Sequence, residues 1–341
     1  MGVREVSPGK DPILIEKMIM ALTLVENLQL AGLEFIFKGG TSLPLVTGKL
    51  NWFSIDIDIV TRPGQDIEPS LQYIIRQKVF TTFEENKREG DLPVAHYKLF
   101  YPSIYVKEGY VLLDVLYEEI KYEKIMVTGI ASPILNLDGE PTIIRCPSPE
   151  CLLGDKLTAF APHTTGIQYS RKKELEITKQ LFDISILFDI VEDIDVVFRT
   201  YKIFSKVELG YRHLDQITPR DAARDTFETS CMIGMYDQMG KDKQHTEYYE
   251  LVSGVTKLRG LVYSGYFSLD VAILCASKAA FISALFIANK TTINRYHQEM
   301  EKDILAWTIK NPDYNKLNKL RKVNVEAFYY FYQALYVLGL L

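Results

Sequence analysis

The sequence lacks the features that mark several classes of protein. Its four cysteines form no Cys-x-x-Cys pair and its five histidines are scattered along 341 residues, so neither a structural zinc site nor a disulfide framework is expected. No apolar signal-peptide core opens the chain. The longest apolar stretch, residues 271–288, is broken by Ser277, Lys278 and Ser283, which favours a buried helix over a membrane span. We therefore expect a cytoplasmic protein with no membrane partner.

There is also no excess of positive charge. Lysine and arginine total 39 against 44 acidic residues, which gives a formal net charge of −5 and no overall attraction for nucleic acid. Internal repeats and low-complexity segments are absent from the sequence. Hydrophobic residues make up 47% of the chain, enough for substantial cores, and the length suggests about two domains.

Hydrophobic periodicity divides the chain into two parts. Up to about residue 195, helical patterns alternate with apolar β-rich runs, and only helical patterns follow. We predict an α+β fold in which residues 1–195 form a strand-containing domain and residues 196–341 an all-helical one. The expected helices cover residues 11–31, 69–84, 149–160, 174–188, 222–239, 244–263, 269–288, 292–309 and 324–340, and the expected strands cover residues 34–38, 53–60, 96–101, 110–117 and 124–127.

A glycine pair and two hydroxyl residues follow the first expected strand. Gly39 and Gly40 end that strand, because glycine tolerates a positive φ and lets backbone N–H groups approach an anion. Thr41 and Ser42 can cap a helix that starts there, and a helix N-terminus attracts phosphate. A Gly-Gly pair alone is usually only a turn, so the segment predicts a phosphate site only together with the strand that follows.

Two aspartates, Asp56 and Asp58, interrupt the isoleucine-rich strand of residues 53–60. Alternate side chains of a strand point to one face, which places Ser54, Asp56 and Asp58 together and the isoleucines in the core. An exposed polar strand face is the plain alternative. Adjacent carboxylates repel unless a cation lies between them, and Mg²⁺ binds carboxylates together with substrate phosphates. Because acids oppose the β-propensity of this strand and such conflicts mark functional sites, we favour a metal site that serves a nucleoside triphosphate.

Three later residues carry charge inside apolar segments. Asp114 lies in the strand of residues 110–117, where a buried lone carboxylate is costly without a cationic partner. It is either an exposed acid near a strand end or, as we prefer, a third metal ligand across the sheet from Asp56 and Asp58. Lys156 and Asp183 lie among apolar neighbours of two helices, where spacing alone also allows a snorkelling lysine and a helix-surface acid.

These residues resemble the AbiEii/AbiGii-type nucleotidyltransferase toxins of the DNA-polymerase-beta-like nucleotidyltransferase superfamily. The family pattern Lys-Gly-Gly-Thr-Ser-Leu, then Phe-Ser-x-Asp-Ile-Asp, corresponds to residues 38–43 and 53–58. A proline-entered helix with a lysine corresponds to residues 149–159, which include Lys156. A later Lys-Asp-x-x-Asp pattern ends here at Asp183, with Gln180 where an acid is common. The resemblance covers about residues 31–190.

The resemblance implies a nucleotidyltransferase-type mixed β-sheet with flanking helices, followed by a helical C-terminal domain. It also implies transfer of a nucleoside monophosphate from an NTP to an acceptor with release of pyrophosphate. Relatives act as toxins beside an antitoxin, and some modify the tRNA acceptor end. By this resemblance, Asp56, Asp58 and Asp114 are expected to bind Mg²⁺ or Mn²⁺, and Asp114 also to activate the acceptor hydroxyl. Asp183 is expected to orient Lys156 or the nucleotide. The residues expected to bind the nucleotide are Gly39, Gly40, Thr41, Ser42, Ser54 and Lys156.

Several alternatives stay open. The acceptor could be a protein or a small molecule such as an aminoglycoside. The chain could instead be a non-catalytic nucleotide-binding module, or a Mg²⁺-dependent phosphotransferase that releases a nucleoside diphosphate. Basic clusters at residues 171–173 and 316–322 are by default solvated surface charge, and otherwise contacts to an RNA backbone.

Overall fold

The computed structural model describes residues 10–86, 93–236, 243–263 and 265–341. The chain forms two compact units, of which unit 1 is Met1–Ser148 with Leu261–Gly265 and unit 2 is Pro149–Gly260 with Tyr266–Leu341. Unit 1 contains the strands, whereas helices build unit 2, and the predicted α+β class is confirmed. The compact units divide the chain at Ser148, whereas the predicted domain boundary lies at residue 195. The helices α5 (Pro149–Ala159) and α6 (Glu174–Phe188) therefore belong to unit 2.

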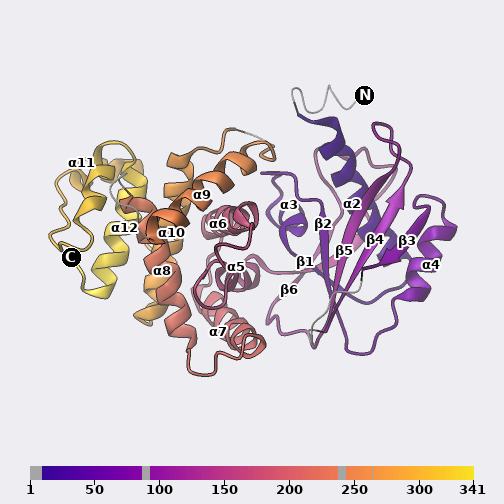
Figure 1. Cartoon of the computed structure of the whole chain (residues 1–341), viewed down its shortest axis with the longest axis horizontal. Helices are drawn as coiled ribbons and strands as arrows, with labels where there is room; N and C mark the ends of the chain where they lie inside the picture. The colour runs from indigo at the N-terminus through magenta and orange to yellow at the C-terminus, as the bar shows by residue number, and fades with distance from the viewer. Residues whose placement is uncertain (1–9, 87–92, 237–242, 264) are drawn as a thin grey trace. The chain divides into compact units, whose positions relative to one another are not determined.

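Unit 1 is built on a five-stranded mixed sheet in the order β1-β2-β5-β4-β3. Strands β2 and β5 are parallel, while the other neighbours are antiparallel. Figure 1 shows β5, β4 and β3 side by side. A separate antiparallel pair, β6 and β7, completes the strands of the described residues. The bounds are β1 (Ile36–Lys38), β2 (Asp56–Thr61), β3 (Thr82–Glu85), β4 (Val94–Tyr101), β5 (Gly109–Tyr117), β6 (Ile125–Gly129) and β7 (Ile143–Pro147).

One face of this sheet is core and the other carries polar side chains. Ile57, Leu99 and Leu113 on the core face are buried in one cluster with apolar residues of α2 (Pro12–Leu30) and α4 (Glu68–Arg76). Because side chains alternate along a strand, the residues between them project from the opposite face. That polar face holds the acids predicted to be functional.

The predicted helix over residues 69–84 is wrong in its second half. Helix α4 ends at Arg76, and Lys78 adopts a left-handed φ of +63°, which a continuing helix cannot accommodate. Phe80 is buried, but it lies in the segment that connects α4 to β3 and not in a helix. Strands β3 and β7 are not among the predicted strands. β3 is a short polar edge strand and offers no apolar alternation.

Unit 2 consists of helices. Figure 1 labels α5 to α12 in this unit. Helix α10 is long and apolar enough to span a membrane by length and composition, and 78% of its most apolar window is buried inside the structure, so the predicted buried helix is confirmed. The bounds beyond α6 are α7 (Ile194–Tyr211), α8 (Pro219–Met235), α9 (Lys243–Arg259), α10 (Leu269–Ile287), α11 (Glu301–Ile304) and α12 (Val325–Leu338), with 3-10 turns at Gln298–Met300 and Asn315–Lys322.

The predicted helix over residues 292–309 is wrong. Only the 3-10 turn and α11 form there. Arg295 donates to the carbonyls of Phe188 and Val191, and these tertiary bonds hold its segment in a non-helical path. All four cysteines are free and buried.

The short segment Leu261–Gly265 returns to unit 1 after helix α9. Val262 pairs with Trp52 in an isolated antiparallel bridge, and the N–H of Phe53 donates to the carbonyl of Leu261 at 2.8 Å. Tyr263 packs edge-on against Phe53, with ring centroids 5.6 Å apart. These contacts support residues 51–53, which precede the strand of the Asp-x-Asp motif.

Candidate functional site

The glycine turn lies directly against the Asp-x-Asp strand. Gly39 has φ +79° and ψ −169°, a region that is essentially restricted to glycine. A Cβ added to Gly39 would lie 2.1 Å from Asp58 Oδ2. A Cβ added to Gly40 would lie 2.9 Å from Ser54 Oγ and 2.9 Å from the ring of Trp52. Both glycines therefore permit a close approach that no other residue allows.

The two hydroxyl residues of the turn hold it in place. Thr41 Oγ1 donates to the carbonyl of Asp56 at 2.6 Å, and Ser42 Oγ donates to the carbonyl of Gly39 at 2.8 Å. Neither hydroxyl caps the helical turns that follow, the 3-10 turn Gly40–Ser42 and α3 (Leu43–Thr47), so the capping prediction is wrong. The nearby carbonyls take these donors instead. Both residues are fully buried; the Thr41 side chain ties the turn to β2, and the Ser42 side chain braces the turn internally.

Four ionisable residues form one row across the polar face of the sheet. Strand register pairs Lys38 with Asp58, Asp58 with Asp114, and Asp114 with His96. Paired residues project from the same face of a sheet, with Cβ atoms about 5 Å apart. We call Lys38, Asp58, Asp114 and His96 the charged row. Asp56 lies two residues before Asp58 on the same face and pairs with Leu112.

Asp114 has a basic neighbour, as expected for a carboxylate in an apolar strand. His96 Nδ1 lies 2.6 Å from Asp114 Oδ1. The His96 side chain is 16% exposed and that of Asp114 is 37% exposed. The carboxylate is therefore held from one side and still accessible to a ligand.

The donor set of the polar face fits a divalent cation that is bound together with phosphates. Asp56, Asp58 and Asp114 place carboxylates on one face, beside a turn whose backbone Asp58 approaches closely. Within the described ranges, no three acid, histidine or cysteine side chains could hold a metal ion as a preformed group. Mg²⁺ commonly takes one or two carboxylates and completes its shell with substrate phosphates and water, and these residues fit that arrangement.

In unit 2, Lys156 on α5 and Asp183 on α6 form a buried ion pair. Their N–O distance is 2.9 Å, with the side chains 12% and 1% exposed. Lys156 also donates to Gln180 Oε1 at 3.0 Å. Gln180 stands where the family usually has an acid, and its amide oxygen still accepts from the lysine. The burial excludes the alternatives of a snorkelling lysine and a helix-surface acid.

The two basic clusters differ in their contacts. In the later cluster, Lys319 donates to the carbonyl of Tyr236, and Arg321 donates to the carbonyl of Trp307 at 2.6 Å. These bonds give that cluster a structural role within unit 2. Residues 171–173 are exposed, so they agree with solvated charge and are also accessible to a partner.

Unit 2 contains a further ionisable cluster, which the sequence does not predict. His163 Nδ1 lies 2.7 Å from Asp225 Oδ1, and Nε2 lies 3.0 Å from Glu247 Oε1. The hydrogen bond with Asp225 raises the pKa of His163 from 6.5 to about 9, with Glu247 adding to the effect. The imidazolium thereby links the loop after α5 to α8 and α9. Its partners are 62 and 84 residues away in sequence, so no local motif signals the cluster.

Comparison with known proteins agrees with this geometry. The family model described as "Nucleotidyl transferase AbiEii toxin, Type IV TA system" matches residues 23–231, which is more than half of the chain. MenT4, a nucleotidyltransferase toxin from Mycobacterium tuberculosis H37Rv, has a similar structure, with a TM-score of 0.51 over 96% of this chain and 97% of that chain at 11% sequence identity. At that identity the likeness concerns the fold. No curated protein sequence matches the chain.

Proposed function

This chain belongs to the AbiEii nucleotidyltransferase toxin family of type IV toxin–antitoxin systems, and from that premise we propose that it transfers a nucleoside monophosphate from an NTP to an acceptor hydroxyl with the help of Mg²⁺ or Mn²⁺. The observation that carries the proposal is the pairing of Asp58 with Asp114 beside the backbone of Gly39. It joins carboxylates and a glycine turn at one place on the sheet.

The residues of unit 1 have different roles in this proposed reaction. The backbone at Gly39 and Gly40 receives the phosphates, because the missing Cβ atoms let an anion approach the N–H groups. The hydroxyl groups of Thr41 and Ser42 hold this turn in place, and Ser54 packs against Gly40. Asp56 and Asp58, with Asp114 beside them, would hold the cation. A bound divalent cation would neutralise charge on the triphosphate and on the leaving pyrophosphate.

Asp114 has the second task of taking the acceptor proton. In the transfer step, the acceptor oxygen forms a bond to the α-phosphorus, and the bond from that phosphorus to the bridging oxygen of the pyrophosphate breaks. The proton of the acceptor hydroxyl goes to the Asp114 carboxylate. The partial exposure of Asp114 supports this role, because a general base must be reachable by the acceptor.

Lys156 serves the same reaction as a fixed positive charge. We propose that it stabilises negative charge on the phosphates and that Asp183 and Gln180 hold its ammonium group. A lysine held by two acceptors keeps one orientation, and little reorganisation is then needed when a phosphate arrives.

The acceptor and the partners are further parts of the proposal. We propose the acceptor end of tRNA as substrate, a cognate antitoxin as partner and the cytoplasm as place of action. Family membership supports the toxin role, and the exposed residues 171–173 offer charge for an RNA backbone. A protein acceptor and a small-molecule acceptor remain outcomes of the test.

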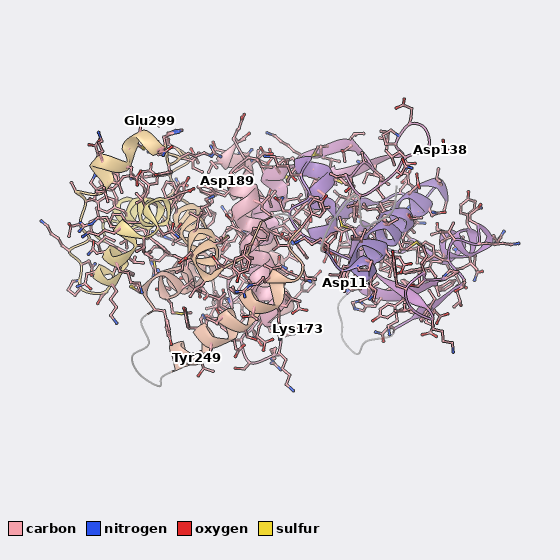
Figure 2. All side chains as sticks on the ribbon, turned by 90° about the horizontal axis from the view of Figure 1, so that it is seen from above. Asp11, Asp138, Lys173, Asp189, Tyr249 and Glu299 are labelled. Carbon is pink, nitrogen blue, oxygen red and sulfur yellow. The ribbon has the colours of Figure 1, made fainter. Side chains whose placement is uncertain are left out.

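The test supplies each α-labelled NTP with separate pools of tRNA, protein and aminoglycoside, and measures label transfer and pyrophosphate. We expect label in tRNA, release of pyrophosphate, and loss of both after chelation of the metal or in Asp58→Asn. The matched control is Asp138→Asn, because Asp138 projects from an exposed loop of unit 1 (Figure 2).

Each other result has a definite meaning. Label only in protein or antibiotic would overturn the tRNA acceptor. Release of a nucleoside diphosphate instead of pyrophosphate would favour a phosphotransferase. Full activity of Asp58→Asn would contradict the catalytic role of the polar face.

A further inference from the structure

The charged row ends in a histidine that the proposed chemistry does not yet use. His96 on β4 is the antiparallel register partner of Asp114 on β5. Its Nδ1 atom lies 2.6 Å from Asp114 Oδ1, and its side chain is mostly buried. At that distance the contact is a short hydrogen bond, just below the roughly 2.7–2.9 Å that is usual for charge-assisted N–H···O bonds.

The chemistry of the two groups assigns the proton. An ionised carboxylate only accepts hydrogen bonds, so the hydrogen must be on Nδ1 of His96, which donates it to Oδ1 of Asp114. The second carboxylate oxygen, Oδ2, does not take part in this bond. The two oxygens of Asp114 therefore differ, because one is committed to His96 and the other is not.

The neighbours of the pair show why this bond matters for a site. Asp58 and Asp114 stand side by side in the parallel ladder, and adjacent carboxylates repel. Lys38 is the register partner on the far side of Asp58, and His96 is the register partner on the far side of Asp114. Each acid thus has a basic residue on its outer side. The next register pair of β4 and β5 on this face, Lys98 with Leu112, joins a charged residue to an apolar one.

We propose that His96 is a positioning residue, which holds Oδ1 of Asp114 so that Oδ2 is the oxygen presented to the acceptor hydroxyl. This inference rests on the proposed function, in which Asp114 takes the acceptor proton. A carboxylate fixed by one hydrogen bond has lost the freedom to exchange its two oxygens. The reacting oxygen is then in place before the acceptor binds.

The kinetic test compares substitutions that keep or remove the Nδ1 donor. In His96→Ala the donor is lost, and we expect kcat for pyrophosphate release to fall by about 10- to 100-fold, the usual effect of losing a supporting hydrogen bond. The KM for the NTP should stay nearly unchanged, because the lost contact acts on the reacting oxygen and not on nucleotide binding. Asparagine carries an amide nitrogen close to the position of Nδ1, so His96→Asn should restore most of kcat.

Two matched variants separate positioning from packing. Glutamine carries its amide nitrogen nearer to the position of Nε2. The kcat of His96→Gln should therefore remain low, although the glutamine side chain is larger than that of asparagine. His297→Ala removes an exposed histidine of unit 2 and should behave like the wild type. If His96→Ala folds and keeps the wild-type kcat, or if asparagine and glutamine rescue equally, the proposal is overturned.

A spectroscopic test does not depend on activity. In protein labelled with ¹⁵N-histidine, His96 should show a proton bonded to Nδ1 with a strongly downfield shift, and Asp114→Ala should abolish that signal. Absence of an Nδ1 proton in the folded wild type would overturn the inference even where the histidine variants misfold. A wild-type protein that shows the signal but releases no pyrophosphate with any acceptor would instead contradict the proposed function.

Discussion

Asp58 Oδ2 lies 2.1 Å from the point where the Cβ of any side chain at Gly39 would be. The contact joins the glycine turn after β1 to the second aspartate of the Asp-x-Asp strand. The turn and the carboxylate therefore fix one another, and a change in either alters the other.

Gly39→Ala should reduce both stability and activity. The alanine would adopt a backbone region that costs on the order of 1–3 kcal/mol, and it would displace the Asp58 carboxylate. We expect pyrophosphate release to fall by more than about 10-fold, the effect of moving a reacting group by roughly an ångström. The control is Gly32→Ala, because Gly32 has φ +78° but no atom within 4 Å of an added Cβ. Equal activity in the two variants would show that the contact with Asp58 has no part in the reaction.

Lys156→Met should destabilise unit 2 strongly. It would remove the positive charge beside the carboxylate of Asp183, which is 1% exposed, at a cost of about 3–5 kcal/mol. The double variant Lys156→Met/Asp183→Leu should recover much of that stability but not the activity. Urea denaturation with an activity assay measures both effects.

The matched control for this pair is Lys257→Met. Lys257 and Glu174 also lie 2.9 Å apart, but the lysine is 49% exposed, and solvent screens such pairs. We expect little change in stability. A loss as large as that of Lys156→Met would mean that burial does not explain the difference.

His163 should make stability depend on pH in the alkaline range. Its pKa is 6.5 in the unfolded chain and about 9 in the folded protein. Because the folded value is raised, the stabilisation is fully present below pH 6.5 and is lost as pH rises through about 9. His163→Gln remains neutral, so the difference in Tm between wild type and variant should shrink across this window. A constant difference would contradict the bridge to Asp225 and Glu247.

Nucleotide and metal should stabilise the protein together. A ligand at 100 times its Kd contributes about 2.7 kcal/mol to the folded state, so Tm should rise with NTP and Mg²⁺ present. Asp58→Asn should remove the rise that depends on Mg²⁺, whereas Asp138→Asn should keep it. A wild-type shift that persists in full after chelation would show that the carboxylates do not bind the nucleotide through a metal.

The sequence predicted those parts of the site that depend on short-range patterns. The glycine turn and β2 are local, and alternation along one strand was enough to place Asp56 and Asp58 on one face. The same reasoning found helix α6 at residues 174–188, because its apolar spacing is regular.

Long-range pairing accounts for what was missed. Lys38 and His96 enter the charged row only through the register of β1 with β2 and of β4 with β5, and register is a property of two strands. The segment around Arg295 was wrongly predicted to be helical for a related reason. Its spacing is helical, but Arg295 is bonded to carbonyls more than a hundred residues away in sequence.

The return of Leu261–Gly265 to unit 1 has a consequence for how this protein can be rearranged. The segment comes from beyond helix α9, yet it supports Trp52, whose ring is in turn close to Gly40. A gene cut anywhere between residues 148 and 260 would deprive unit 1 of a piece of its own structure. Unit 1 is therefore discontinuous in sequence, and a fragment that ends before Leu261 lacks part of it.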